Sequence, residues 1–193
     1  YEKYVKNKVI MIETDFYYFK PRQILNKEEE RQITMSGELE YFPLDEVDRA
    51  ILGKLAENAR ISLIELSQSV KLTPNGIKQR IKNFEKNKII LGYRVMINYA
   101  LLNFLHYRVF LHLENLTEQK EKSMIQFLKN DKNVISITKT VGYCELEFRA
   151  IIPNVHEFYH LIEELRIRYP DLIKDYESVL YHQFYETLNY FPF

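Results

Sequence analysis

The chain has 193 residues, which is enough for one medium domain or two small ones with a substantial core. Lys and Arg total 27, as do Asp and Glu, and a net charge of +0 taken alone argues against a nucleic-acid-binding protein. The single cysteine, Cys144, excludes an intrachain disulfide and a cysteine cluster for zinc or iron–sulfur ligation. No apolar run approaches the roughly 18–20 residues of a membrane helix, so we expect a cytoplasmic protein without membrane contact.

The N-terminal part of the chain divides into two segments by composition. Residues 1–25 are rich in β-forming residues, as at 9–12 and 16–19, which predicts a β-strand segment. Residues 26–43 are charged and contain Gly37, and we expect them to form a charged linker that contains at most a short helical turn.

A helical period of apolar residues begins at Leu44. Val47, Ile51 and Leu55 fall on one side of a helix, which predicts a first helix in this stretch. Acidic residues cluster at its start, beginning with Asp45, and they suit the positive N-terminal end of a helix.

Two further helices have clear start signals. Ser62 can cap a second helix over 63–70, with a glutamate at the position that completes a capping box. Thr73 can cap a third helix, with Pro74 at its first position, and we expect this helix to run to about Asn87.

A strand pattern over 89–97 follows the third helix. Three short helices that end in a strand, with a tight turn at 70–73 between the last two helices, are typical of a winged helix-turn-helix. We place this domain at 44–98 and a hinge at 99–104.

The rest of the chain, 105–193, alternates between strand and helix patterns. We expect a strand at 107–113, a helix at 117–130, strands at 134–141 and 144–152, a helix at 155–169 and a long strand from 173 to about 188. This βαββαβ order predicts a ferredoxin-like sandwich with two helices on one face of an antiparallel sheet. The fold class is α+β: a winged helix-turn-helix joined to a ferredoxin-like βαββαβ domain, preceded by an extra β segment.

One face of the predicted sheet is left without helices. We expect it to carry residues such as Phe110 and Ile137. An apolar sheet face needs a cover, and self-association of the chain is the simplest one.

The neutral total charge hides an asymmetry along the chain. Residues 44–98 hold 10 Lys and Arg against 6 Asp and Glu, a net charge of +4, while 99–193 carry −3 and 1–43 carry −1. Between positions 71 and 94 there are seven cations and one anion, Glu85. The basic charge is therefore concentrated on the third helix and the segment after it.

A basic helix face is often only a solvated surface, but this one coincides with a capped helix-turn-helix, which favours contact with DNA. Amide side chains at the start of such a helix can pair with adenine, a lysine can approach guanine, and the other cations serve phosphates. The expected base-facing residues are Asn75, Gly76, Lys78 and Gln79, and the expected phosphate contacts are Thr73, Arg80, Lys82 and Lys88.

Several short motifs in this order resemble the Lrp/AsnC ("feast/famine") transcription regulators. They are LDEVDRAIL at 44–52, NARIS at 58–62, LTP at 72–74, RIKNFE at 80–85 and IILGY at 89–93. The βαββαβ half resembles the sensing domain of the same family, so that the likeness covers about 44–190. It implies a non-enzymatic regulator without a cofactor that binds double-stranded DNA. It further implies a homodimer or a larger assembly formed through the sheet domain, and modulation by an amino acid or a similar small molecule.

The resemblance places an effector site in the loop after the strand at 134–141. The corresponding residues here are Val141, Gly142, Tyr143 and Glu145. The family commonly has a threonine before the glycine and an aspartate three residues after it, whereas this chain has valine and glutamate.

The two ends of the chain resemble each other. A pattern of Glu-Thr followed by Tyr-Phe occurs at 13–19 and, with one gap, at 186–191. One interpretation is that residues 1–25 are the last strand of a preceding sensing domain, so that the chain is the C-terminal part of a tandem-type family member. Chance similarity between two aromatic strands explains the pattern equally well.

Three alternatives compete with DNA-binding regulation. His156, Glu157 and His160 match the metalloprotease pattern HExxH, but the core stripe of their predicted helix faces the other way, so we expect no metal site and keep the two histidines as a weak candidate pair. Haem-pathway decarboxylases reuse the Lrp/AsnC architecture. The cationic candidates for such a role are His106, Arg108, His112 and Arg149. A non-DNA-binding assembly module on the same fold is the third alternative.

Overall fold

The computed structural model describes residues 8–25, 33–37 and 41–181. These residues form two compact units, one made of 41–96 and the other of the described parts of 8–37 together with 97–181. The C-terminal repeat of the Glu-Thr motif lies outside the described residues, and so do Tyr185 and Tyr190. Within the described part of the chain, no helix is long and apolar enough to cross a membrane.

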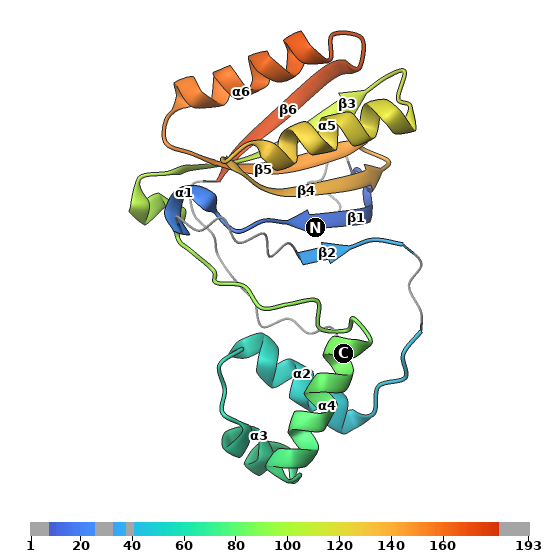
Figure 1. Cartoon of the computed structure of the whole chain (residues 1–193), viewed down its shortest axis with the longest axis vertical. Helices are drawn as coiled ribbons and strands as arrows, with labels where there is room; N and C mark the ends of the chain where they lie inside the picture. The colour runs from blue at the N-terminus through green and yellow to red at the C-terminus, as the bar shows by residue number, and fades with distance from the viewer. Residues whose placement is uncertain (1–7, 26–32, 38–40, 182–193) are drawn as a thin grey trace. The chain divides into compact units, whose positions relative to one another are not determined.

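The 41–96 unit is a bundle of three helices (Figure 1). They are α2 (Glu46–Glu57), α3 (Leu63–Val70) and α4 (Pro74–Lys86). A small apolar core joins them. Its buried members are Ile51, Leu52, Leu66, Ile77 and Phe84.

Helices α3 and α4 begin at the residues that the sequence predicts, and α2 begins at Glu46, directly after Asp45. The side chain of Asp45 accepts the backbone N–H of Asp48, and Ser62 is both the N-cap of α3 and half of a capping box with Glu65. Thr73 caps α4, with a proline at the first turn. Side-chain caps satisfy backbone N–H groups that have no partner inside the helix, so the chain fixes these starts locally.

The strand predicted over 89–97 is wrong. Residues 91–98 have no regular secondary structure, and Lys88 takes a left-handed conformation with φ of 57° at the point where the chain leaves α4. The backbone N–H of Ile89 donates to the carbonyl of Phe84 at 2.8 Å, which ends the helix. A strand needs a partner, and no other strand is described in the 41–96 unit.

The second unit is built on one six-stranded sheet (Figure 1). Its strand order is β2-β1-β4-β5-β3-β6, and every neighbouring pair is antiparallel. The elements in chain order are β1 (Ile12–Tyr18), α1 (Arg22–Leu25), β2 (Ile33–Met35), the 3-10 helix η2 (Tyr99–Leu102), β3 (Leu105–Leu113), α5 (Glu118–Asn130), β4 (Val134–Val141), β5 (Leu146–Ile152), α6 (Val155–Arg168) and β6 (Ile173–Tyr181). The predicted βαββαβ order is confirmed by β3 to β6.

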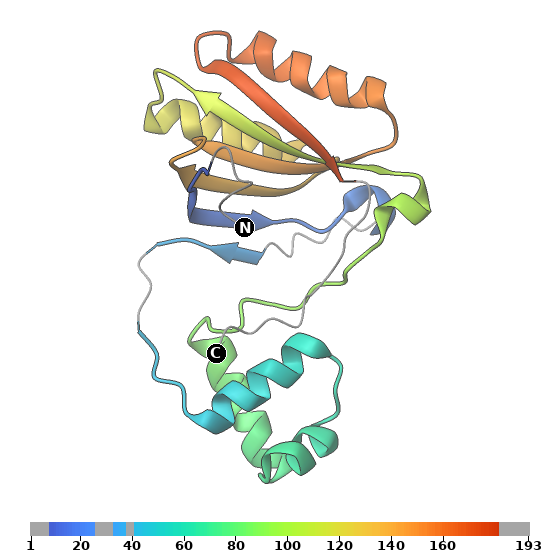
Figure 2. The same ribbon diagram turned by 180° about the vertical axis from the view of Figure 1, so that it is seen from behind.

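Helices α5 and α6 lie on the same face of this sheet (Figures 1 and 2). The main core lies between them and the strands, with Phe148 and Val109 fully buried. Ile137 also belongs to this core, so its predicted place on the helix-free face is wrong. A register shift in β4 between Val134 and Ser136 changes which residues of the strand face the helices.

The N-terminal segment is part of the same sheet. Strand β1 pairs with β4 from Ile12 opposite Val141 to Tyr18 opposite Ser136, and Phe19 enters the main core. The predicted linker at 26–43 is wrong at Ile33–Met35, which forms β2 on the outer side of β1. Alternating Ile and Met side chains favour pairing there although the surrounding residues are charged.

Two polar contacts fasten this N-terminal segment to α5. The guanidinium of Arg22 donates to the carbonyls of Lys129 and Asp131 at the end of α5, the second at 3.2 Å. Lys139 on β4 lies 3.0 Å from a carboxylate oxygen of Glu121 on α5 and 3.6 Å from one of Asp15 on β1. The segment predicted as a hinge, 99–104, contains η2 and the buried ring of Tyr99.

Candidate nucleic-acid interface

Helix α4 has two different sides. Its inner side carries Ile77 and Phe84, which are both fully buried in the small core, with Ile81 half-buried beside them. These positions follow the spacing i, i+4, i+7 of an amphipathic helix. The outer side therefore points to solvent along the whole length of the helix, and after Pro74 the exposed side chains on it are polar or charged.

The outer side holds most of the predicted DNA-contacting residues. The side chains of Asn75, Lys78, Gln79 and Lys82 are exposed. Among described residues, none of these four side chains has a hydrogen bond or an ion pair, so their donors and acceptors are available to a ligand. The structure thus brings together the amides and lysines that the sequence places on one helical face.

The first turn of α4 adds backbone groups to this surface. Thr73 accepts the N–H of Gly76 at 3.2 Å, and as a hydroxyl it keeps its own proton to donate outward. A Cβ at Gly76 would meet the Oγ1 of Thr73 at 3.3 Å, so the glycine keeps the capped turn compact. The helix N-terminus also carries partial positive charge, which favours an anion such as phosphate.

Two of the predicted phosphate contacts have different settings. Lys88 is exposed just beyond α4, where a cation can reach a backbone phosphate. Arg80 is half-buried, and its Nη1 donates to Asp45 at 2.7 Å and to Asp48 at 2.5 Å. The geometry gives no support to Arg80 as a phosphate contact, because both of its close partners are carboxylates of α2 and its cap.

In this ion pair, each partner shifts the pKa of the other. The hydrogen bond from Arg80, followed by the backbone N–H of Asp48, holds the pKa of Asp45 below its ordinary value. The same two carboxylates raise the pKa of Arg80. A signal for this contact exists in the sequence, because position 80 is three residues after Ile77 and four before Phe84, at the edge of the buried stripe.

The predicted effector loop follows β4 in the other unit. Gly142 has φ of +118°, and a Cβ there would lie 2.5 Å from the carbonyl oxygen of Ile10. The Sγ of Cys144 lies 3.8 Å from the sulfur of Met11, and burial raises the pKa of this thiol. Residues 10–11 of the N-terminal segment therefore pack against one side of the loop.

The polar residues of the loop are also engaged. Glu145 accepts the backbone N–H of Leu113 at 2.7 Å, and the hydroxyl of Tyr143 donates to Glu177 on β6. Val141 is 60% exposed. The loop is thus an ordered turn with one accessible apolar residue. The carboxylate of Glu145 accepts its hydrogen bond from the backbone of β3.

The sheet face opposite α5 and α6 carries buried charge that the sequence did not reveal. Glu147 on β5 is fully buried and accepts hydrogen bonds from Arg108 at 2.5 Å and Arg149 at 3.3 Å. His112, on the same face, lies 3.1 Å from Glu177. The cationic residues considered for a decarboxylase share one face, but three of them are already paired with carboxylates of the same chain.

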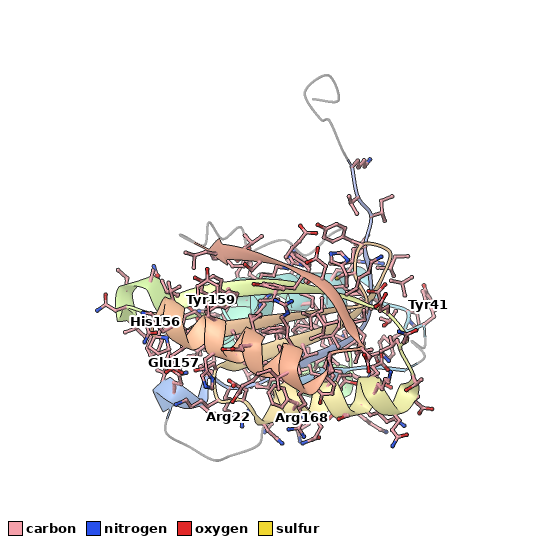
Figure 3. All side chains as sticks on the ribbon, turned by 90° about the horizontal axis from the view of Figure 1, so that it is seen from above. Arg22, Tyr41, His156, Glu157, Tyr159 and Arg168 are labelled. Atoms are coloured by element: carbon pink, nitrogen blue, oxygen red, sulfur yellow. The ribbon has the colours of Figure 1, made fainter. Side chains whose placement is uncertain are left out.

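The HExxH pair lies on the outer surface of α6. His156 and Glu157 are exposed there (Figure 3), and so is His160, whose Nδ1 lies 3.7 Å from a carboxylate oxygen of Glu164. Among the described residues, no group of three or more His, Cys, Asp and Glu is placed to hold a metal ion. The pattern therefore forms a polar helix surface.

A capped helix-turn-helix whose last helix exposes amides and lysines without partners defines a DNA-binding protein of the helix-turn-helix class. The comparison with known protein families agrees. Residues 44–90 match the family model described as winged helix-turn-helix DNA-binding.

Known proteins and structures resemble most of the chain. An uncharacterized HTH-type transcriptional regulator of Pyrococcus furiosus is 32% identical over 127 residues, which cover 65% of this chain and 82% of the relative. The leucine-responsive regulatory protein of Klebsiella pneumoniae is 27% identical over 132 residues, covering 66% of this chain and 78% of that protein. A transcriptional regulator of Neisseria meningitidis, solved as an L-Met complex, has the same fold with a TM-score of 0.64 at 21% identity, over 75% of this chain and 93% of that one.

The chain belongs to the Lrp/AsnC family of helix-turn-helix transcription regulators. Its function is DNA-binding transcription regulation, and its relatives are regulators rather than enzymes. The resemblance seen in the motifs at 44–93 is confirmed, as is the α+β fold.

Proposed function

We propose that the chain recognises a specific double-stranded DNA sequence by placing the N-terminal half of α4 in the major groove. The observation that carries this proposal is the row of exposed side chains without partners, Asn75, Lys78 and Gln79, at the start of a capped helix. In helix-turn-helix proteins this part of the recognition helix meets the base edges. Amides pair with adenine and lysine approaches guanine, so these residues supply sequence preference.

Affinity comes from a second set of residues on the same surface. Lys82 and Lys88 are exposed cations, and the hydroxyl of Thr73 lies at the helix N-terminus beside Gly76. These groups suit phosphate oxygens on either side of the groove. Because each neutralised phosphate releases counterions, the duplex affinity of the protein falls as the salt concentration rises.

Selection from a random pool of duplexes at a stated salt concentration tests this function. The selected duplex is then bound by the wild-type chain, Gln79→Ala and Lys82→Ala. We expect Gln79→Ala to lose about 1–3 kcal/mol of discrimination at one position. Lys82→Ala should weaken all duplexes alike and reduce the log–log salt slope by about 0.9. The proposed DNA recognition would be ruled out if the wild-type chain enriched no sequence, or if its duplex affinity did not change with salt concentration.

The sheet unit is proposed to assemble copies of the chain. The face opposite α5 and α6 exposes half-buried Phe110 and, on β6, Val179 at 47% exposure, which a second copy can cover. A two-fold dimer also presents two recognition helices to two half-sites on DNA. Sedimentation of the full chain across concentrations tests this proposal, and a monomer at every concentration would contradict it.

A small amphipathic effector such as an amino acid is proposed to bind at or near Val141, Gly142, Tyr143 and Glu145. The N. meningitidis relative was solved with L-Met, which supports this ligand class. Thermal shift of the full chain with each of the twenty amino acids tests it, since a ligand that binds the folded state raises Tm. We expect the chain to act in the cytoplasm, where it meets DNA.

A further inference from the structure

The ion pair between Arg80 and the start of α2 has a position that matters for DNA recognition. Arg80 lies in the middle of α4, one residue after Gln79, yet its guanidinium turns back to Asp45 and Asp48. Asp45 is the N-cap of α2, and Asp48 is the N3 residue of the same capping box. One side chain of the recognition helix is therefore bound to the residues that define where another helix begins.

This contact links α4 electrostatically to the start of α2. Among the described residues of 41–96, Arg80 pairs with Asp45 and Asp48 across helical regions, whereas Lys54 and Glu57 pair within α2. Asp48 is 8% exposed, and the side chain of Arg80 is 32% exposed. One guanidinium nitrogen, Nη1, donates to both carboxylates, so the contact adds charge-assisted hydrogen bonds between α4 and the start of α2 to the apolar packing of the small core.

We propose that Arg80 is a positioning residue for DNA recognition: with Asp45 and Asp48 it fixes the rotation of α4, and so the direction in which Asn75 and Gln79 meet the bases. Arg80 does not bind phosphate. This inference rests on the proposed function, because it concerns the same DNA-facing surface.

The two roles of Arg80 predict opposite effects when its partners are neutralised. If Arg80 bound phosphate, Asp48→Asn would remove one of the two carboxylates that compete for its guanidinium, and duplex affinity would stay the same or rise. If Arg80 positions α4, Asp48→Asn weakens the selected duplex roughly tenfold, the loss of about one base contact. Glu46→Gln is the matched control, because it removes one exposed negative charge from the same turn of α2.

Substitutions of Arg80 itself separate the roles further. Arg80→Lys keeps a cation that can serve a phosphate, but its ammonium lies nearer the backbone than Nη1, the guanidinium nitrogen that reaches both carboxylates. We expect Arg80→Lys and Arg80→Gln to lose affinity for the selected duplex while the salt slope stays at the wild-type value. Their affinity for a scrambled duplex of the same length should change little, so that discrimination falls. Arg80→Gln combined with Asp48→Asn should be no weaker than the worse single variant.

The comparison uses the full chain, and circular dichroism at the binding temperature checks that each variant is folded. Asp45→Asn, which changes an exposed cap, replaces Asp48→Asn if the latter unfolds. The proposal is overturned if Arg80→Gln lowers the salt slope by about 0.9, as Lys82→Ala should, while Asp48→Asn binds at least as tightly as the wild type. A wild-type chain that selects no duplex overturns the proposed function and this inference together, whereas a selective wild type with the opposite pattern of variants overturns this inference alone.

Discussion

The two units of the chain are held together by different kinds of interaction. In 41–96, each helix starts at a cap that accepts an N–H three residues further on, and the core has five buried apolar residues. In the sheet unit, the main core has nineteen buried members, and its strands join distant parts of the chain, as when the N–H of Phe19 donates to Ile135 at 2.8 Å. The DNA-binding unit is thus specified locally, and the sheet unit by long-range pairing.

The units also place their charges differently. On α4 the cations Lys78 and Lys82 are exposed, and the buried part of the helix is apolar apart from the edge position of Arg80. In the sheet unit a carboxylate, Glu147, lies fully buried between Arg108 and Arg149. A surface used for DNA needs its charges in solvent, whereas buried charges are stable only when they are paired.

The largest difference should appear when each core loses one aromatic ring. Phe84 and Phe148 are both buried, at 1% and 0% exposure, and replacing a buried phenylalanine with alanine costs about 3–5 kcal/mol. In the five-residue core this loss should unfold the helices, so Phe84→Ala abolishes duplex binding. Phe148→Ala should leave α2 to α4 protected from amide hydrogen exchange.

Hydrogen exchange resolved by peptide measures both variants. Phe84→Ala is expected to raise exchange throughout 41–96 and to leave the strands of the sheet protected. If both variants raised the exchange rate equally in both units, the two units would unfold together and not independently.

Neutralising the buried carboxylate of Glu147 tests whether the buried charges of the sheet unit depend on being paired. In Glu147→Gln, Arg108 and Arg149 remain directly opposite each other on β3 and β5 without the charge that joins them. We expect a loss of about 2–4 kcal/mol in the free energy of unfolding, somewhat less than for a completely buried triad because both arginines are a quarter exposed. Urea denaturation measures it. Glu163→Gln, an exposed change on α6, should cost less than about 0.5 kcal/mol.

The pH dependence of stability should also differ between the units. Burial, and then the charge of Arg149, lowers the pKa of His106 from 6.5 to about 4. Between these pH values the unfolded chain binds a proton that the folded chain does not. The sheet unit is therefore fully stabilised above about pH 6.5 and loses about 2–3 kcal/mol as the pH falls towards 4.

Carboxylates titrate in the same range, so the measurement is a difference between variants. His106→Phe keeps an aromatic ring between Tyr99 and Tyr181 and removes the titration. Its unfolding free energy should fall less steeply than that of the wild type between pH 6.5 and 4. His156→Gln, on the exposed side of α6, should keep the wild-type slope. Parallel slopes for wild type and His106→Phe would contradict the assignment.

Sequence patterns predicted the helix caps and strand bounds that depend on neighbouring residues in the chain. The caps Ser62 and Thr73 are where the sequence puts them, and β4 runs over 134–141 as expected. What the patterns missed depends on partners far along the chain. Residues 89–97 have strand-forming residues, but no strand among the described residues pairs with them, while Ile33–Met35 lies in a charged stretch and pairs with β1.

The residues of the candidate site also divide into those that local spacing predicts and those that depend on distant partners. The exposed face of α4 follows from helical spacing, so Asn75, Lys78 and Gln79 could be chosen from the sequence. For Arg80 the spacing predicts only a place at the edge of the buried stripe, because the sequence does not identify the carboxylates 32 and 35 residues earlier that bind it. Charge alone therefore assigned it to phosphate.

The smallest expected effect compares one cap in each unit. Ser62→Ala removes the N-cap of α3, an eight-residue helix, and Thr117→Ala removes the N-cap of α5, a thirteen-residue helix packed on the sheet. Each loss costs about 1 kcal/mol. Because α3 has a single buried residue, Leu66, to hold it, this cost should appear as faster exchange along the whole of α3. In α5, which buries Met124, Ile125 and Leu128, the increase should be confined to the first turn.

Replacing Ser62 with threonine, which keeps a capping hydroxyl, should restore most of the protection of α3. If both alanine variants frayed only the first turn, the helices of the DNA-binding unit would be held by their packing as firmly as those of the sheet unit. The contrast between local and long-range specification would then describe how the two units can be predicted from sequence, and not how they are stabilised. Whole-helix exchange in α3 alone would show that caps contribute most where the core is smallest, since helices this short are marginal without tertiary support.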